Sequence, residues 1–475
     1  MFPGESDTYF RRLNPASQAE MFLYIGEVKA EGLNAFVAEA LARRHGKPFE
    51  AVSLVPDILG SYPGCNVLAL NSRARALSAS TGRTTACRMP PGEFAAAVSC
   101  SPDAQKLVRD LLRKQGRLFV HVFESAPELA ISGLPGVSLL APAAGLAALW
   151  NNKLYQFHRL KDDAPLVEYR ICAGADDVAA EAAHALRRWP EGVFVSQAYS
   201  AAGGNSFVLR VPEELERRLP LPDSVYFISR YIPHDFDPTV LGVVANGRDV
   251  YIAGLADQQI EGGNQFRGSS FPSLLPAELQ REAKECTRQV GRVLGKSGYR
   301  GIFGCDYVVD GSGRLFFVEV NARKQGTTME MCCTLENLLP PGAPTLMDIE
   351  HDAIVHRRLP DGCVELETPP GKRLCWRTYN VKTDRAGIVC GDCPAGEDER
   401  ELFRKTAAGE TDGGSIVLEH VGRDIGVTPG MFLGRAVAVA RDPAVADRAL
   451  AAARRRLTKT LQYKKESENE TAAQP

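Results

Sequence analysis

The sequence has no excess of charge of one sign, no uninterrupted apolar run and no regular cysteine framework. Its 56 lysines and arginines nearly balance its 58 aspartates and glutamates, so no overall field would gather phosphate backbones. The uncharged run at residues 130–150 is cut by glycines and prolines into pieces too short to span a bilayer. The 12 cysteines are scattered, which is typical of a reducing compartment. We therefore expect a cytoplasmic protein whose partners are neither nucleic acids nor membranes.

The length and composition indicate a globular protein of several domains. A chain of 475 residues is too long for one hydrophobic core and suggests about three. With 44% hydrophobic and 24% charged residues, its composition is ordinary for such a protein. Residues 1–20 are polar and charged and lack the apolar stretch that a secretory signal needs.

Hydrophobic periodicity changes along the chain and predicts its domains. Between about residues 20 and 150, short apolar runs alternate with helix-like stretches, which is typical of a mostly parallel sheet covered by helices. Apolar residues within 276–295 recur every three or four positions and predict a helix that a glycine ends. Two apolar runs then flank the turn sequence "DGSG" and predict a hairpin. Asp442 and Pro443 mark the start of a further helix.

These patterns predict an α/β domain at residues 1–150, an α+β domain at 151–345 and a smaller C-terminal α+β region at 346–464. Residues 465–475 are too polar to pack and are expected to be disordered.

The segment "FFVEVNARKQGTT", residues 316–328, carries polar groups at every second position after an apolar start. If the hairpin turn centres on Gly311 and Ser312, Asp306 opposes Phe317 and shares a face with Glu319 and Asn321. Such a face is often merely solvated, but here it would also carry three apolar side chains, Val308, Leu315 and Phe317.

Two carboxylates and an amide oxygen among apolar neighbours repel one another unless a cation lies between them. Oxygen ligands suit Mg²⁺, which completes its shell with water and phosphate oxygens. The hairpin therefore predicts a site for a magnesium nucleotide.

At these residues the sequence resembles the ATP-grasp superfamily, whose metal motif is an aspartate on one strand and Glu-x-Asn on the next. Thirteen positions separate Asp306 from Glu319, as in that motif. Arg323 and Gln325 resemble the biotin-carboxylase-like branch, in which the arginine lies near the acyl phosphate or substrate. The resemblance covers roughly residues 136–330. It implies a pre-ATP-grasp α/β domain, a two-lobed ATP-grasp domain and the additional C-terminal region.

The same resemblance implies roles for residues outside the hairpin. The segment "GVSLLAPAAGLAALWNNKLYQFHRLKD" resembles the junction in which a lysine contacts nucleotide phosphate, and the strand and small-residue loop at 193–207 resemble the loop that closes over phosphates. The family commonly has a lysine where this chain has Gln197. The segment at 226–244 resembles the linker whose backbone binds adenine. The implied nucleotide contacts are Lys153, Gln197, Ser200, Gly203, Gly204, Ser206, Tyr231 and Ile232.

The resemblance implies a ligase that activates a carboxylate as an acyl phosphate and joins it to an amine. Its cofactors are ATP and Mg²⁺, with Mn²⁺ as an alternative ion. Asp306, Glu319 and Asn321 are the implied metal ligands, and Arg323 and Arg267 the implied catalytic residues. The partners are small carboxylates and amines, with a homodimer as a further expectation. A carboxylase, a thiol ligase and a nucleotide-binding module that has lost catalysis stay open, the last because of Gln197.

Two other residue groups are not expected to form metal or redox sites. Cys390 and Cys393 form a CxxC, but Cys363 and Cys375 lie too far apart to complete a zinc ribbon. The CxxC also lacks the context of a redox motif. The eight histidines are expected to form no metal-binding cluster, because His351 and His356 are five apart, which is a poor spacing on a helix.

Overall fold

A computed structural model describes most of the chain, and its contacts divide it into two compact units. The described residues are 8–14, 17–62, 64, 66–199, 206–217, 224–261, 265–366, 373–383, 385–391, 398–419, 421–460 and 463–464. The first unit comprises Met1–Ala141, Cys332–Pro340 and Thr368–Pro475, and the second comprises Pro142–Met331 and Pro341–Glu367. The predicted disordered tail lies outside the described residues.

Within the described ranges, no helix combines the length and the apolar character that crossing a membrane requires.

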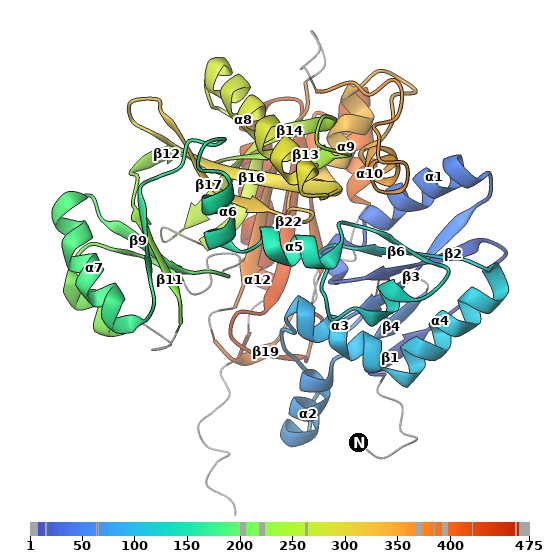
Figure 1. The fold of residues 1–475 in the computed structure, drawn as a ribbon. Helices are drawn as coiled ribbons and strands as arrows, with labels where there is room; N and C mark the ends of the chain where they lie inside the picture. The colour runs from blue at the N-terminus through green and yellow to red at the C-terminus, as the bar shows by residue number, and fades with distance from the viewer. Residues whose placement is uncertain are drawn as a thin grey trace, which may run out of the picture. The chain divides into compact units, whose positions relative to one another are not determined.

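The first unit contains the predicted α/β sheet. Its strand order is β1-β4-β3-β2-β6-β7, and all neighbours are parallel except β1 and β4. The strands are β1 (Phe10–Arg12), β2 (Glu20–Ile25), β3 (Phe49–Val55), β4 (Val67–Ala69), β6 (Leu118–Val122) and β7 (Val137–Leu140). Helix α1 (Leu33–His45) covers one face of the sheet, and α3 (Pro91–Cys100) and α4 (Pro102–Gln115) cover the other (Figure 1).

Residues near the C-terminus belong to the same unit as the N-terminal sheet. The division into units therefore differs from the predicted domains, whose boundaries were placed at 150 and 345. Strand β5 (Thr85–Ala86), which follows α2 (Ser72–Thr81), pairs in parallel with β21 (Gly426–Val427). Strand β21 in turn pairs with β19 (Gly387–Val389), which pairs with β23 (Tyr463–Lys464). No local pattern in the sequence could predict this pairing, because its two strands lie far apart in the chain.

A second antiparallel group in the first unit contains β20 (Gly413–Glu419), β22 (Phe432–Ala440) and β18 (Cys375–Lys382). Helix α11 (Glu399–Ala408) and the predicted helix α12 (Pro443–Thr460) pack against it. The side chain of Asp442 accepts hydrogen bonds from the backbone N–H groups of Ala444 and Val445, which confirms the predicted start of α12.

The second unit has two lobes, each built on an antiparallel sheet. The smaller sheet has the order β10-β9-β11-β8 and is covered by α7 (Ala175–Arg188). Its strands are β8 (Tyr169–Cys172), β9 (Val193–Gln197), β10 (Ser206–Leu209) and β11 (Tyr226–Arg230). The larger lobe contains β12 (His234–Phe236), β13 (Pro238–Val244), β14 (Val250–Glu261), β15 (Gln265–Phe271), β16 (Gly301–Asp310) and β17 (Leu315–Asn321).

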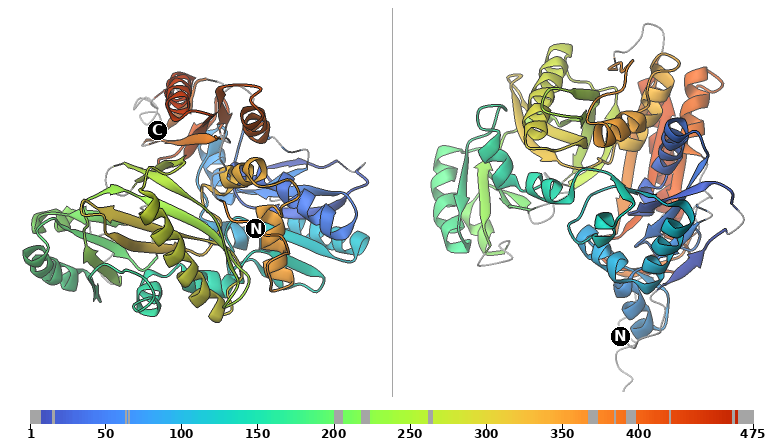
Figure 2. Two further views of the ribbon diagram at one scale, coloured as in Figure 1. Left: turned by 90° about the horizontal axis from the view of Figure 1, so that it is seen from above. Right: turned by 45° about the vertical axis from the view of Figure 1, so that its right-hand side comes forward.

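Helix α8 (Ala277–Lys296) packs along β13, β14 and β16 of the larger sheet, as Figures 1 and 2 show. Its predicted inner face is confirmed, since Ala283, Val290 and Leu294 are buried. Gly295 does not end the helix as expected, because α8 continues to Lys296. A Cβ at Gly295 would instead lie 2.2 Å from the backbone oxygen of Asn246, so the glycine permits close contact with a neighbouring turn.

The second unit also contains the helices α5 (Ala144–Trp150), α6 (Lys153–Arg159) and α10 (Leu346–Val355). Helix α9 (Thr328–Leu338) begins in the second unit and ends in the first.

Candidate active site

The hairpin of β16 and β17 pairs differently from the sequence prediction. Tyr307 opposes Phe317, and Asp306 opposes Glu319, with a register shift between the two pairs. One residue of β17, Val318, is therefore extra, which defines a β-bulge. The prediction that Asp306 opposes Phe317 is wrong for two reasons. Val309 already opposes Leu315, one residue further along than the predicted turn allows, and the bulge shifts the register by one more residue.

The bulge determines which side chains share the polar face. Tyr307 and Phe317 lie in the hydrophobic core. Leu315 also lies in the core, opposite Val309, so neither it nor Phe317 belongs to the polar face as predicted. Because a one-residue shift turns the following side chains to the other face of a strand, the bulge places Glu319 beside Asp306. The predicted proximity of these two carboxylates is thus confirmed, but it depends on a feature that the prediction lacked.

Four polar side chains hold Asp306 in place. Thr239 donates a hydrogen bond to Oδ1 at 2.6 Å, and the Asn321 amide donates to Oδ2 at 2.8 Å. The Gln325 amide donates to Oδ1 at 3.2 Å, and Gln258 also bonds the carboxylate. Burial and then the nearby Glu319 raise the pKa of Asp306 to about 6. A cation between the carboxylates would remove the repulsion that contributes to this shift.

Lys153 contacts the second carboxylate of this pair. It is the first residue of α6, where the side chain of Asn152 caps the helix by accepting a hydrogen bond from the Tyr155 N–H. The Lys153 ammonium lies 2.9 Å from Oε2 of Glu319. Its side chain is only 10% exposed, so the ion pair is well shielded from water.

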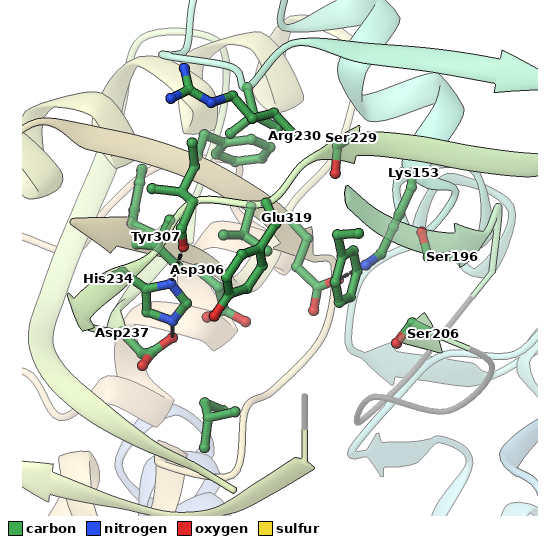
Figure 3. A pocket seen from close by; sticks show the side chains of 18 of the residues that line it. Lys153, Ser196, Ser206, Ser229, Arg230, His234, Asp237, Asp306, Tyr307 and Glu319 are labelled. Carbon is green, nitrogen blue, oxygen red and sulfur yellow. Dashed lines mark hydrogen bonds and ion pairs between the residues drawn. The ribbon is translucent and has the colours of Figure 1, made fainter. Parts of the chain in front are cut away.

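A cavity of about 190 Å³ connects the lysine, the carboxylates and the linker after β11. Figure 3 shows Lys153 and Glu319 pointing toward one another, with Asp306 beside them and Ser196 and Ser206 near the lysine. Aromatic and aliphatic side chains form much of the remaining wall, among them Phe157, Val167, Phe194, Phe227, Ile260 and Phe266. A largely apolar cavity with a few convergent polar groups is the usual form of a small-molecule site.

A comparison with protein families identifies the region that contains this cavity. Residues 151–327 match a family model described as an ATP-grasp domain. The chain contains an ATP-grasp domain. The L-propargylglycine–L-glutamate ligase of Streptantibioticus cattleyicolor is 34% identical to it over 124 residues, which are 26% of this chain and 25% of that ligase. The similarity to this relative thus spans about a quarter of the relative's length.

Solved structures share the fold over nearly the whole chain. The biotin carboxylase of Campylobacter jejuni has a TM-score of 0.61 at 13% identity, with 95% of this chain and 93% of that chain covered. The L-amino acid ligase of Bacillus licheniformis has a TM-score of 0.60 at 13% identity, with 95% and 100% covered. These values confirm the predicted multi-domain fold of α/β and α+β type.

The predicted site residues fall into three groups in the ATP-grasp domain. The residues that line the cavity are Lys153, Ser206, Tyr231, Ile232, Asp306 and Glu319, and Asn321 is bonded to Asp306 beside it. Three others do not line it: Gln197 donates a hydrogen bond to Ser224, Arg267 pairs with Glu261, and Arg323 donates to the backbone oxygen of Lys324. Ser200, Gly203 and Gly204 lie outside the described residues. The roles of all these residues remain predictions.

The cavity residues that were not found from the sequence include Ser196, His234, Asp237 and Gln258. Ser196 precedes Gln197 on β9, and adjacent side chains of a strand point to opposite faces, so only one of the two can face the cavity. The Ser196 hydroxyl is buried and has no hydrogen-bond partner among the described residues. A buried donor of this kind fits a ligand that supplies an acceptor, such as a phosphate oxygen.

Gln325 occupies space that the absence of a side chain at Gly304 leaves open. Its amide nitrogen bonds both Thr239, at 2.9 Å, and Asp306. A Cβ at Gly304 would lie 2.0 Å from Cδ of Gln325. Gly304 therefore permits Gln325 to reach under the sheet and orient the carboxylate.

Replacing Gly304 with alanine should displace Gln325 and lower the free energy of unfolding by about 1–3 kcal/mol. Urea unfolding measures this, with Gly311→Ala as a control because a Cβ there meets nothing within 4 Å. Adding Gln325→Ala to Gly304→Ala removes the clash, so the double variant should lose less stability than the sum of the single variants. Strict additivity would contradict the proposed contact.

His234 and Asp237 form a hydrogen-bonded pair on the cavity wall (Figure 3). Nε2 of His234 lies 2.9 Å from Oδ1 of Asp237, and Nδ1 donates to the Ile232 backbone oxygen at 2.6 Å. Burial alone lowers the pKa of His234, but the hydrogen bond and charge of Asp237 and the bond to Ile232 outweigh it, and the pKa is raised. Both ring nitrogens face acceptors, which favours the imidazolium form.

This pair predicts a pH-dependent contribution to stability. The imidazolium is stabilised in the folded state, so the contribution is fully present below the unfolded pKa of about 6.5 and is lost as pH rises through the raised pKa. Asp237→Asn should lower the free energy of unfolding by about 1–2 kcal/mol at pH 6 and by much less at pH 9. Asp162→Asn, at an exposed position that is not among the groups that raise the pKa of His234, is the control. Urea unfolding across this range would contradict the account if the Asp237→Asn deficit did not change with pH.

Proposed function

We propose that the protein is an ATP-dependent ligase that activates a carboxylate as an acyl phosphate and joins it to an amine, releasing ADP and phosphate. The observation that carries the proposal is the pairing of Asp306 with Glu319 at the cavity, with Lys153 reaching the same carboxylate. The similarity to an L-propargylglycine–L-glutamate ligase supports amino acids or short peptides as substrates.

The donor set fits a magnesium ion. Asp306 and Glu319 offer carboxylate oxygens, Asn321 offers an amide oxygen, and oxygen donors of this kind are preferred by Mg²⁺. In the structure the Asn321 amide nitrogen bonds Asp306, and a rotation of the amide group would present its oxygen instead. When bound, Mg²⁺ would neutralise charge on the transferring phosphoryl group.

The other residues of the cavity would bind and orient the nucleotide. The ammonium of Lys153 would leave Glu319 and pair with phosphate oxygens instead. The hydroxyls of Ser196 and Ser206 would donate hydrogen bonds to the same phosphates. Backbone groups of Tyr231 and Ile232 would bind adenine. The apolar wall would exclude water, which matters because water would hydrolyse an acyl phosphate before the amine attacks it.

The carboxylate substrate needs cationic partners other than Lys153. Arg323 and Arg267 are the proposed candidates, since a guanidinium binds a carboxylate or a phosphate through two parallel hydrogen bonds. Each would exchange its present partner, the Lys324 backbone oxygen or the Glu261 carboxylate, for the substrate.

Trapping of the activated acid with hydroxylamine tests this mechanism. The protein is incubated with Mg·ATP, hydroxylamine and single amino acids, and both hydroxamate and nucleotide products are measured. An acyl phosphate predicts one hydroxamate for each ADP formed. Formation of AMP and pyrophosphate would contradict the proposal, because it would indicate an acyl adenylate. Saturable ATP binding without either product across the whole panel would favour a non-catalytic nucleotide-binding module.

A further inference from the structure

Two imidazoles and a carboxylate meet at the C-terminal end of α10, in the second unit. Nδ1 of His351 lies 3.0 Å from Oδ1 of Asp352, and Nε2 of His356 lies 4.0 Å from the same oxygen. One donor atom from each of the three residues lies within 4.8 Å of the other two. The expectation that the histidines form no metal-binding cluster is therefore corrected. It assumed helical spacing, whereas α10 ends at Val355, before His356.

The turn after α10 directs His356 back toward the helix. His356 has φ −103° and ψ −7°, and its N–H donates to the Asp352 backbone oxygen at 2.8 Å. Arg357 follows in the left-handed region, with φ 59°, and its backbone oxygen accepts a hydrogen bond from the Asn246 side chain at 3.0 Å. A residue other than glycine rarely adopts this conformation, and such residues concentrate at functional sites.

We propose that His351, Asp352 and His356 bind a divalent transition-metal ion, with Zn²⁺ as the best match. Two imidazole nitrogens and one carboxylate oxygen are a donor set typical of Zn²⁺ and its neighbours in the first transition row, whereas Mg²⁺ prefers oxygen donors alone. The site is therefore distinct in chemistry from the carboxylate pair of the ATP-grasp cavity.

The exposure of the three residues suits a site that is anchored on one side and open on the other. The side chains of His351 and Asp352 are 3% and 9% exposed, which limits their movement, while that of His356 is 50% exposed. The open side allows the ion to enter and water to complete a tetrahedral shell. Binding of the ion would displace the proton between His351 and Asp352. A modest rotation of the His356 side chain would bring its Nε2 closer to Asp352, from which it is now 4.0 Å away.

The location of the cluster connects it to the ATP-grasp site through one helix. The N-terminus of α10 is fixed by a capping box between Thr345 and Asp348. Glu350, next to His351, accepts the buried ammonium of Lys324 at 2.8 Å, and Lys324 follows Arg323. A cation at the C-terminal end of the helix would interact favourably with its dipole and stabilise this end as well. The metal would thus stabilise α10, and Glu350 of this helix holds Lys324, which follows β17 with its predicted metal ligands.

Calorimetric titration of the chelator-treated full-length protein with Zn²⁺, without nucleotide or Mg²⁺, tests the proposal. We expect one equivalent to bind, and His356→Ala to weaken binding on the order of 100-fold. His184→Ala, at an exposed position on α7, is the matched control and should bind like the wild type. Absence of stoichiometric binding, or equal binding by His356→Ala and the wild type, would overturn the proposal.

Co²⁺ absorption separates this site from binding by cysteine thiols. The wild-type complex should show ligand-field bands without thiolate charge transfer, whereas His356→Cys should retain binding and add thiolate charge transfer. Thiolate absorption in the wild type would assign the ion to cysteines and overturn the proposal. Because these titrations contain no nucleotide, their failure leaves the proposed ligase activity untouched, and failure of the ligase assay leaves this site untouched.

Discussion

Replacing Glu319 with glutamine should lower turnover about a thousandfold while leaving the fold and the binding of metal-free ATP in place. The change keeps the size of the side chain but removes one of the two opposed carboxylates at the β16–β17 hairpin. A metal ion supplies several kcal/mol of transition-state stabilisation in such reactions, and each 1.36 kcal/mol is about tenfold in rate. Steady-state ADP release measures the loss, and calorimetry without metal measures ATP binding.

Glu278→Gln is the matched control for this experiment. This variant makes the same substitution at an exposed position in the first turn of α8, and Glu278 does not line the cavity. It should react at the wild-type rate. A Glu319→Gln variant with a rate close to wild type would show that the carboxylate pair does not hold the catalytic metal.

The Lys153→Met variant should lose ATP affinity about 10- to 100-fold and at the same time gain affinity for Mn²⁺ in the absence of nucleotide. Charge-assisted hydrogen bonds contribute roughly 1.5–3 kcal/mol, which sets the first effect. The second effect arises because the Lys153 ammonium lies 2.9 Å from Glu319 and neutralises the carboxylate that a metal would use. Removing the ammonium leaves two carboxylates whose mutual repulsion a bound cation relieves, so we expect about a tenfold gain in affinity for Mn²⁺.

Calorimetry measures ATP binding, and electron paramagnetic resonance measures free Mn²⁺. Lys161→Met, an exposed lysine shortly after α6, should change neither affinity. Unchanged Mn²⁺ affinity in Lys153→Met would indicate that the ammonium and the metal use different places, and the proposed exchange of Lys153 from Glu319 to phosphate would then be wrong.

Local patterns were sufficient to predict the main elements of the fold. The alternation of apolar runs predicted the parallel sheet of the first unit, because both β-strands and amphipathic helices have characteristic periods. The turn sequence at 310–313 predicted the hairpin, and the apolar face of α8 predicted that helix. The spacing of Asp306, Glu319 and Asn321 indicated a metal site, and that role stays a prediction.

The sequence did not reveal features that depend on the register of strands or on contacts distant in the chain. The bulge at Val318 has no residue signature, yet it determines whether Glu319 faces Asp306 or the core. For the same reason the sequence could not tell that Ser196, not Gln197, lines the cavity. The pairing of β21 with β5 joins residues more than 300 positions apart, and the end of α10 brings His356 back to Asp352.

Nucleotide turnover with defined substrates tests the proposed ligase most directly. The protein is incubated with Mg·ATP and a panel of amino acids, singly and in pairs, while ADP and phosphate are measured and products are identified by mass spectrometry. The account predicts ADP formation that requires two substrates, with a product whose mass equals their sum less one water. Turnover that instead requires bicarbonate or a thiol, or tight Mg·ATP binding without turnover across the whole panel, would contradict it.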